Sequence, residues 1–216
     1  MKYGVRNNDV LLAIDKDYLQ MSTTHQTLQL SSKNYNLTLT LIEDLETNHS
    51  IQIKEDDSII EIEDIENSTH LILIEDLNPK KKRRCFLKSF KRSLVLQPKD
   101  NRNAHCAIIA DNQLILSTGS CMVSIDLISF SMNWKYEDFW HVLFEFYPIE
   151  DDYLIRGELN IIRISKHGEV RWVFSGKDIW VNLEGKPEIT IHNSSITLID
   201  FNNETYEIDY NGTLIY

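Results

Sequence analysis

Residues 153–172, YLIRGELNIIRISKHGEVRW, contain two short strands, a tight turn and a further strand that carries an aromatic residue. Apolar and polar residues alternate along Ile162-Arg163-Ile164-Ser165, which is typical of a half-buried strand. The turn Lys166-His167-Gly168-Glu169 places a glycine where a positive φ is expected. This stretch therefore predicts consecutive antiparallel strands joined by tight turns.

The same pattern occurs again on either side, in residues 113–134 and 195–216. The turn glycine recurs as Gly212, and the aromatic residue is Trp134, Trp172 or Tyr216 in the three copies. The first two copies also continue alike, since Asp138-Phe139-Trp140 matches Asp178-Ile179-Trp180. Agreement of strands, turn and aromatic residue indicates an internal repeat of one sheet unit.

The repeat resembles the blades of β-propellers, particularly the quinoprotein-like kind, over about residues 107–216. The resemblance implies a repeated antiparallel sheet and specifies no activity. Three copies are too few for a closed propeller, which needs at least about four blades. We therefore expect an all-β protein of antiparallel meander units, in an incomplete propeller-like or sandwich arrangement.

The first half of the chain shows the same period-2 alternation without the repeat. It is clear at Leu28-Gln29-Leu30, at residues 37–41 and at residues 71–74, with turn-forming clusters between. A short helix over residues 138–146 is an alternative to a strand. We predict an N-terminal β region over residues 1–97 and a C-terminal repeat region over residues 98–216, and leave open whether they share one core.

The charge of the chain is strongly and unevenly acidic. The net charge is −11, from 33 acids and 22 bases, which disfavours non-specific binding to nucleic acid. Residues 43–76 hold twelve acids and one base, and the basic run Lys80–Arg84 follows. We expect this run in an exposed hairpin or linker as a solvated loop; a nuclear-localisation or anion-binding patch is the alternative.

The cellular location is expected to be the cytoplasm of a bacterium. The first residues lack the apolar core of a signal peptide, and no apolar stretch is long enough to span a bilayer. The three cysteines have no CxxC spacing, which favours reduced, buried thiols.

Groups capable of chemistry are present but incomplete. Asp138, His141 and Glu145 lack the second histidine of a zinc protease, although they leave a cryptic hydrolase as an alternative. His105, Cys106 and Cys121 lack a fourth metal ligand, and residues 117–121 lack nucleophile-elbow and P-loop signatures. We expect no catalytic, metal-binding or cofactor-binding residues, and no enzyme.

The tryptophans fall into two groups. Trp134 and Trp172 occupy the repeat position, so we expect them to pack between successive sheet units. Trp140 and Trp180 each lie two residues after an aspartate, and core packing and partner contact are equally open for them.

Three functional classes follow. The first is a protein-binding module, similar in size and charge alone to bacterial immunity proteins, whose acidic surface would neutralise a basic toxin. The second is a scaffold of propeller-like units, and the third is the hydrolase. The residues predicted to contact a partner are Glu43, Asp44, Glu61, Glu63, Asp64, Trp140 and Trp180.

Overall fold

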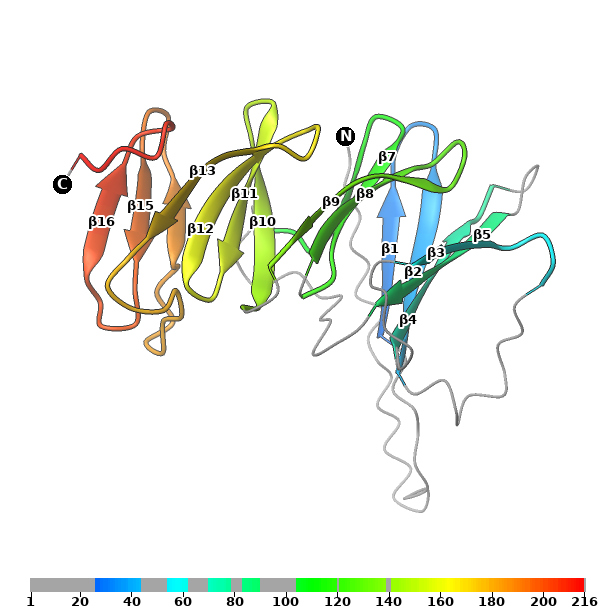
Figure 1. Cartoon of the computed structure of the whole chain (residues 1–216), viewed down its shortest axis with the longest axis horizontal. Helices are drawn as coiled ribbons and strands as arrows, with labels where there is room; N and C mark the ends of the chain where they lie inside the picture. Colours follow the sequence, from blue (N-terminus) through cyan, green and yellow to red (C-terminus); the bar gives the residue numbers. More distant parts are fainter. Residues whose placement is uncertain are drawn as a thin grey trace, which may run out of the picture. The chain divides into compact units, whose positions relative to one another are not determined.

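The computed structural model describes residues 26–43, 54–61, 70–78, 83–89, 104–119, 121–138 and 141–215. All regular secondary structure within these ranges consists of β-strands, so the all-β prediction is confirmed (Figure 1). The helix considered for residues 138–146 is wrong for its described part, because Leu143–Ile149 forms strand β10. No helix suited to crossing a membrane occurs in the described ranges.

Two compact units make up the chain. The first comprises Met1–Gln97, Ile108–Ile115 and Ile125–Met132, and the second comprises Pro98–Ala107, Leu116–Ser124 and Asn133–Tyr216. The division into an N-terminal region over residues 1–97 and a C-terminal region over residues 98–216 stays a prediction.

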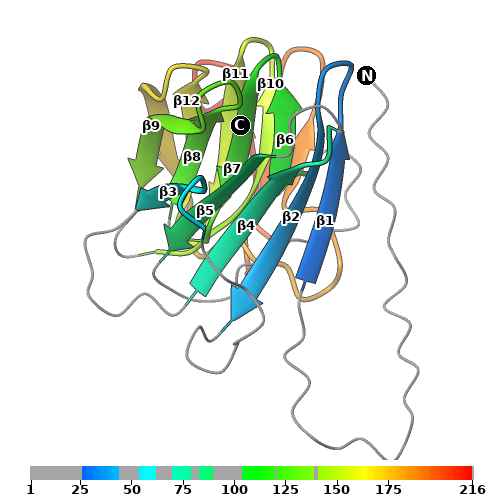
Figure 2. The ribbon, with the colours of Figure 1, turned by 90° about the vertical axis from the view of Figure 1, so that its right-hand side faces the viewer.

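The first unit contains a five-stranded sheet in the order β1-β2-β4-β5-β3 (Figure 2). Its strands are β1 (Gln26–Ser31), β2 (Asn36–Glu43), β3 (Ser58–Glu61), β4 (His70–Asp76) and β5 (Arg83–Ser89). Leu28 pairs with Leu39, and Ile74 pairs with Cys85, so that alternate apolar residues cover one face and are buried. One pair departs from the antiparallel pattern, because β3 runs parallel to β5.

The basic run lies partly in this sheet. Strands β4 and β5 pair as an antiparallel hairpin, as predicted, and Lys80, Lys81 and Lys82 fall outside the described residues. The expectation of a solvated loop is wrong for Arg83 and Arg84, which are half-buried at the start of β5. Arg84 lies 3.5 Å from Asp57 and 3.8 Å from Glu75, because these acids lie beside it in the folded sheet.

Three further sheets follow, and each runs in chain order as a meander. Two of them have four strands and the third has three, and a meander of four consecutive strands is the arrangement of a propeller blade. The first is β6 (Ala107–Ala110), β7 (Gln113–Ser117), β8 (Cys121–Asp126) and β9 (Ser131–Glu137); the second is β10 (Leu143–Ile149), β11 (Asp152–Gly157), β12 (Asn160–Ser165) and β13 (Val170–Ser175); the third is β14 (Ile189–Ile191), β15 (Ile196–Ile199) and β16 (Thr205–Ile208). In the third sheet, Leu214 bridges to Ile208 beside β16, where a fourth strand would begin.

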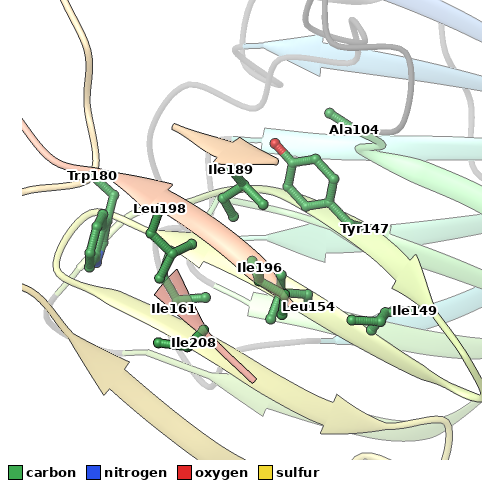
Figure 3. Packing of buried hydrophobic residues seen from close by; sticks show 10 residues of the cluster. All are labelled: Ala104, Tyr147, Ile149, Leu154, Ile161, Trp180, Ile189, Ile196, Leu198 and Ile208. Carbon is green, nitrogen blue, oxygen red and sulfur yellow. The ribbon is translucent and has the colours of Figure 1, made fainter. Parts of the chain in front are cut away.

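Apolar side chains from the last two sheets form one core in the second unit (Figure 3). Leu154 and Ile161 of the sheet β10–β13 meet Ile196, Leu198 and Ile208 of the sheet β14–β16. Each fully buried side chain of this kind contributes roughly 1.5–3 kcal/mol to folding. The core therefore fixes these two sheets against each other.

Each repeat tryptophan packs against the glycine turn of the next sheet. The indole N–H of Trp134 donates to the carbonyl of Lys166 at 2.9 Å, and that of Trp172 donates to the carbonyl of Tyr210 at 2.9 Å. Gly168 and Gly212 have φ of 87° and 78°, and a Cβ on either would lie 2.7 Å from the indole ring. The predicted turn conformation and the predicted packing of both tryptophans are confirmed.

Arg83 makes the corresponding contact with the turn between β8 and β9. Arg83 donates to the carbonyls of Leu127, at 3.2 Å, and Ile128, and its guanidinium lies 4.4 Å from the ring centre of Phe130. Leu127 and Lys166 directly follow strands β8 and β12, which end at Asp126 and Ser165, and Tyr210 is the second residue after β16, which ends at Ile208. Arg83 thus replaces tryptophan as the side chain that contacts the turn, and we call these three contacts the turn contacts.

We expect Gly212→Ala to destabilise the protein by about 2–4 kcal/mol, because its methyl group would overlap the Trp172 ring as well as strain the backbone. Gly185→Ala is the matched control, since Gly185 has φ of 76° with nothing within 4 Å, and it should cost about 1 kcal/mol. Urea unfolding measures both. Equal losses would show that the contact between ring and turn contributes nothing.

Candidate functional site

The connection between β13 and β14 is long and has no regular structure. It spans residues 176–188, between Ser175 and Ile189. Loops of this length are uncommon in compact domains, and they are usually binding loops, lids or disordered linkers. The hydrogen bonds of this loop, described next, show that it is ordered.

Trp180 anchors the loop in the core. Its side chain is fully buried, its indole N–H donates to the carbonyl of Leu159 at 3.0 Å, and its backbone N–H donates to the carbonyl of Glu158 at 2.8 Å. Its ring lies edge-on to Tyr206 with the centroids 5.5 Å apart. Figure 3 shows it at the edge of the apolar cluster.

A buried ion network lies under this anchor. The guanidinium of Arg156, which has no exposed surface, donates to both oxygens of Glu145, with Nη2 at 2.8 Å from Oε2, and to the carbonyl of Trp180. Glu188, at the end of the loop, lies 3.5 Å from Arg156, and the Tyr147 hydroxyl donates to Glu145 at 3.0 Å. The network joins two strands of the second sheet to both ends of the loop.

The protonation of this network follows from its surroundings. Burial lowers the pKa of Arg156, but the hydrogen bond and charge of Glu145 and the charge of Glu188 outweigh it and hold the pKa above its ordinary value. Burial, and then the charge of Glu145, raise the pKa of Tyr147 far above its ordinary value. The tyrosine therefore stays neutral and acts as a donor.

The turn between β15 and β16, residues 200–204, is bonded to the loop. The backbone N–H of Phe201 donates to the carbonyl of Ile179 at 2.9 Å, and the Asn202 amide donates to Asp178 at 2.6 Å. The Asn203 side chain exchanges hydrogen bonds with Asn182 and Glu184 at 3.1 and 3.2 Å. We call residues 176–188 and 200–204 together the loop site.

A buried carboxylate shapes the turn itself. Asp200 is fully buried and accepts hydrogen bonds from the backbone N–H groups of Asn202, at 3.0 Å, and Glu204, at 2.9 Å, and from the Tyr206 hydroxyl at 2.9 Å. Asn203 has φ of 63°, a conformation that asparagine tolerates better than most residues. The turn is therefore held from within as well as by the loop.

Two apolar side chains are exposed on this ordered scaffold. Leu183 is 78% exposed and Phe201 is 40% exposed. Both lie among residues fixed by hydrogen bonds, so presenting them to a partner requires little ordering of the loop. Ordered, exposed apolar side chains are suited to binding, because their burial by a partner requires less loss of loop entropy.

A polar pocket of about 600 Å³ also lies in the second unit. It is lined by Glu150, Asp152, Arg163, Arg171, Trp172, Tyr210 and Asn211. Arg163 donates to Asp152, Glu150 and the carbonyl of Tyr210 at 2.7–2.8 Å, so its charge is already balanced. Two acids and two arginines line the pocket, so its charges balance and it has no preference for an anionic or a cationic ligand.

The predicted partner residues are only partly within the described ranges. Glu43 ends strand β2 and Glu61 is exposed at the end of β3, whereas Asp44, Glu63, Asp64 and Trp140 lie outside the described residues. Their role in binding stays a prediction. The complete burial of Trp180 favours core packing over partner contact for that residue.

The residues considered for chemistry take part in other interactions. His141 Nδ1 lies 3.1 Å from Asp138, and Glu145 is engaged by Arg156 and Tyr147. Cys106 and Cys121 are buried, and burial raises the pKa of Cys106 to about 11. In the ranges that the structure describes, no three histidine, cysteine, aspartate or glutamate side chains are grouped as a metal site requires.

The loop site itself was not predicted from the sequence. Asp178 and Trp180 were singled out, but Leu183 and Phe201 lie in segments without periodicity. The sequence contains one signal of this loop, which is the long stretch without strand periodicity over residues 176–188. Gly185 and Pro187 mark that stretch as irregular.

No protein-family model matches the chain, and no curated protein matches it. Among solved structures, the crystal structure of BamB from Moraxella catarrhalis is similar, with a TM-score of 0.40 and 10% sequence identity. The match covers 87% of this chain and 62% of that chain, so this chain spans less than two thirds of that protein. A similarity at this level says nothing about function, and the propeller-like assignment depends on the strand order and the turn contacts.

We expect Arg156→Met to destabilise the protein by about 3–5 kcal/mol, because Glu145 would be left buried without its counter-charge. The double variant Arg156→Met, Glu145→Leu should regain at least half of that loss. Hydrogen exchange at residues 176–188 should also become faster in the single variant, since the carbonyl of Trp180 loses its donor. Unchanged exchange there would contradict the coupling between network and loop.

Proposed function

We propose that this protein is a non-enzymatic protein-binding module that contacts its partner through the loop site. The observation that supports this most is the exposure of Leu183, in the loop 176–188, and of Phe201, in the turn 200–204, because hydrogen bonds join these two segments. Rigid apolar side chains at the centre of a polar rim are the usual source of binding energy in protein interfaces. The sheets then act as a scaffold that positions the loop.

Within this proposal, the finer function is that of an inhibitor of the immunity-protein kind, in a bacterial cytoplasm, acting on a basic toxin. The net charge of −11 supports it, because an acidic protein associates faster with a basic one. The three cysteines, Cys85, Cys106 and Cys121, are buried thiols, which suits a reducing compartment.

A scaffold that assembles with other chains is the second candidate. Strand β13 is at one end of its sheet in the order β10-β11-β12-β13, with Val170 and Val173 45% and 53% exposed. Such an edge can pair with a strand of another protein. The bulge at Arg171, where the β12–β13 register shifts, makes this edge less suitable.

We expect the double variant Leu183→Ser, Phe201→Ser to lose the binding partner while remaining folded, because both side chains are exposed. Val173→Ser, a similarly exposed apolar residue on β13, is the matched control. Quantitative affinity capture from the source organism, with wild type and both variants as baits, measures the difference. The proposal requires a protein that wild type and Val173→Ser retain and the double variant loses at least tenfold. Loss with Val173→Ser alone would favour the scaffold candidate.

A further inference from the structure

The last sheet and its loop concentrate the negative charge of the second unit. Residues 176–215 contain seven acidic residues and only two lysines. Lys177 lies 2.7 Å from Glu204, and Lys186 lies 2.8 Å from Glu184, so both cations are already paired with acids. Arg156 is shared between Glu145 and Glu188, which leaves that network with one excess negative charge.

The acids at the rim of the loop site are accessible to a partner. The pair between Lys177 and Glu204 is 73% and 43% exposed at its side chains, and the pair between Lys186 and Glu184 is 50% and 58% exposed. Exposed pairs of this kind contribute little to folding, so a partner cation can replace the lysine at little cost. The loop site therefore offers accessible carboxylates next to Leu183, at Glu184, and in the turn that carries Phe201, at Glu204.

We infer that the loop site binds a basic protein segment in which lysine or arginine residues flank one apolar side chain. The apolar residue packs on Leu183 and Phe201, and the flanking cations meet Asp178, Glu184 and Glu204. Arginine suits these carboxylates best, because its guanidinium can donate two parallel hydrogen bonds. This inference depends on the proposed function and specifies the chemistry of the partner.

The test uses phage-displayed random peptides of about twelve residues selected on the immobilised full chain. Enriched peptides should carry two or more lysine or arginine residues around a single leucine, isoleucine, methionine or aromatic residue. Synthetic copies should bind at least tenfold more weakly to Leu183→Ser and about three- to tenfold more weakly to Asp178→Asn, measured by fluorescence anisotropy. The affinity should also fall as salt rises.

Glu61→Gln is the matched control for the loss of one charge, since Glu61 is an exposed acid of the first unit. It should leave binding unchanged. A larger effect of Glu61→Gln than of Asp178→Asn would overturn the inference in favour of the acidic surface predicted over residues 43–76.

The remaining outcomes separate the inference from the proposed function. Enriched peptides that lack basic residues but lose affinity with Leu183→Ser would overturn the inference and support the proposed function. Basic peptides that bind Leu183→Ser and Asp178→Asn as tightly as wild type would show unspecific charge attraction and overturn the inference. Failure to enrich any peptide would count against both.

Discussion

The hydrogen bond from an indole N–H to the first carbonyl of a glycine turn is the contact on which the repeat depends. It is made by Trp134 to Lys166 and by Trp172 to Tyr210, each at 2.9 Å. One such bond contributes about 1 kcal/mol, and the larger effect is steric, because the ring occupies the space where a side chain on the turn would lie. A turn with a positive φ and no Cβ is therefore a requirement of the contact.

The contact of Arg83 shows which part of this geometry is indispensable. At the turn between β8 and β9, the residue with a positive φ is Phe130, at 55°, instead of a glycine. A guanidinium donates to the same class of carbonyl and stacks on the phenyl ring. In all three turn contacts, a side-chain N–H donates to a carbonyl of the turn. Where the turn has a glycine the donor is an indole, and where it has Phe130 the donor is a guanidinium.

How much of this could be predicted depended on whether the signal was local. Period-2 alternation predicted the strands, the recurring glycines Gly168 and Gly212 predicted the turns, and the repeat position of Trp134 and Trp172 predicted that they pack between successive sheets. Arg83 was missed because a run of basic residues is usually solvated, and only the fold brings it to Phe130. The parallel pairing of β3 was missed for a related reason, since alternation defines the faces of a strand and not its partner.

The loop site could not be predicted because its order comes from contacts distant in sequence. Nothing within residues 176–188 indicates that Asn182 will meet Asn203, or that Arg156 will donate to the carbonyl of Trp180. That buried arginine also explains why the core of the second unit is not purely apolar. Apolar replacements for Arg156 and Glu145 can fill the same space, but they would leave the carbonyl of Trp180 without a donor and the loop unfixed at that residue. The ion network thus specifies the position of the loop more than it adds to the stability of the fold.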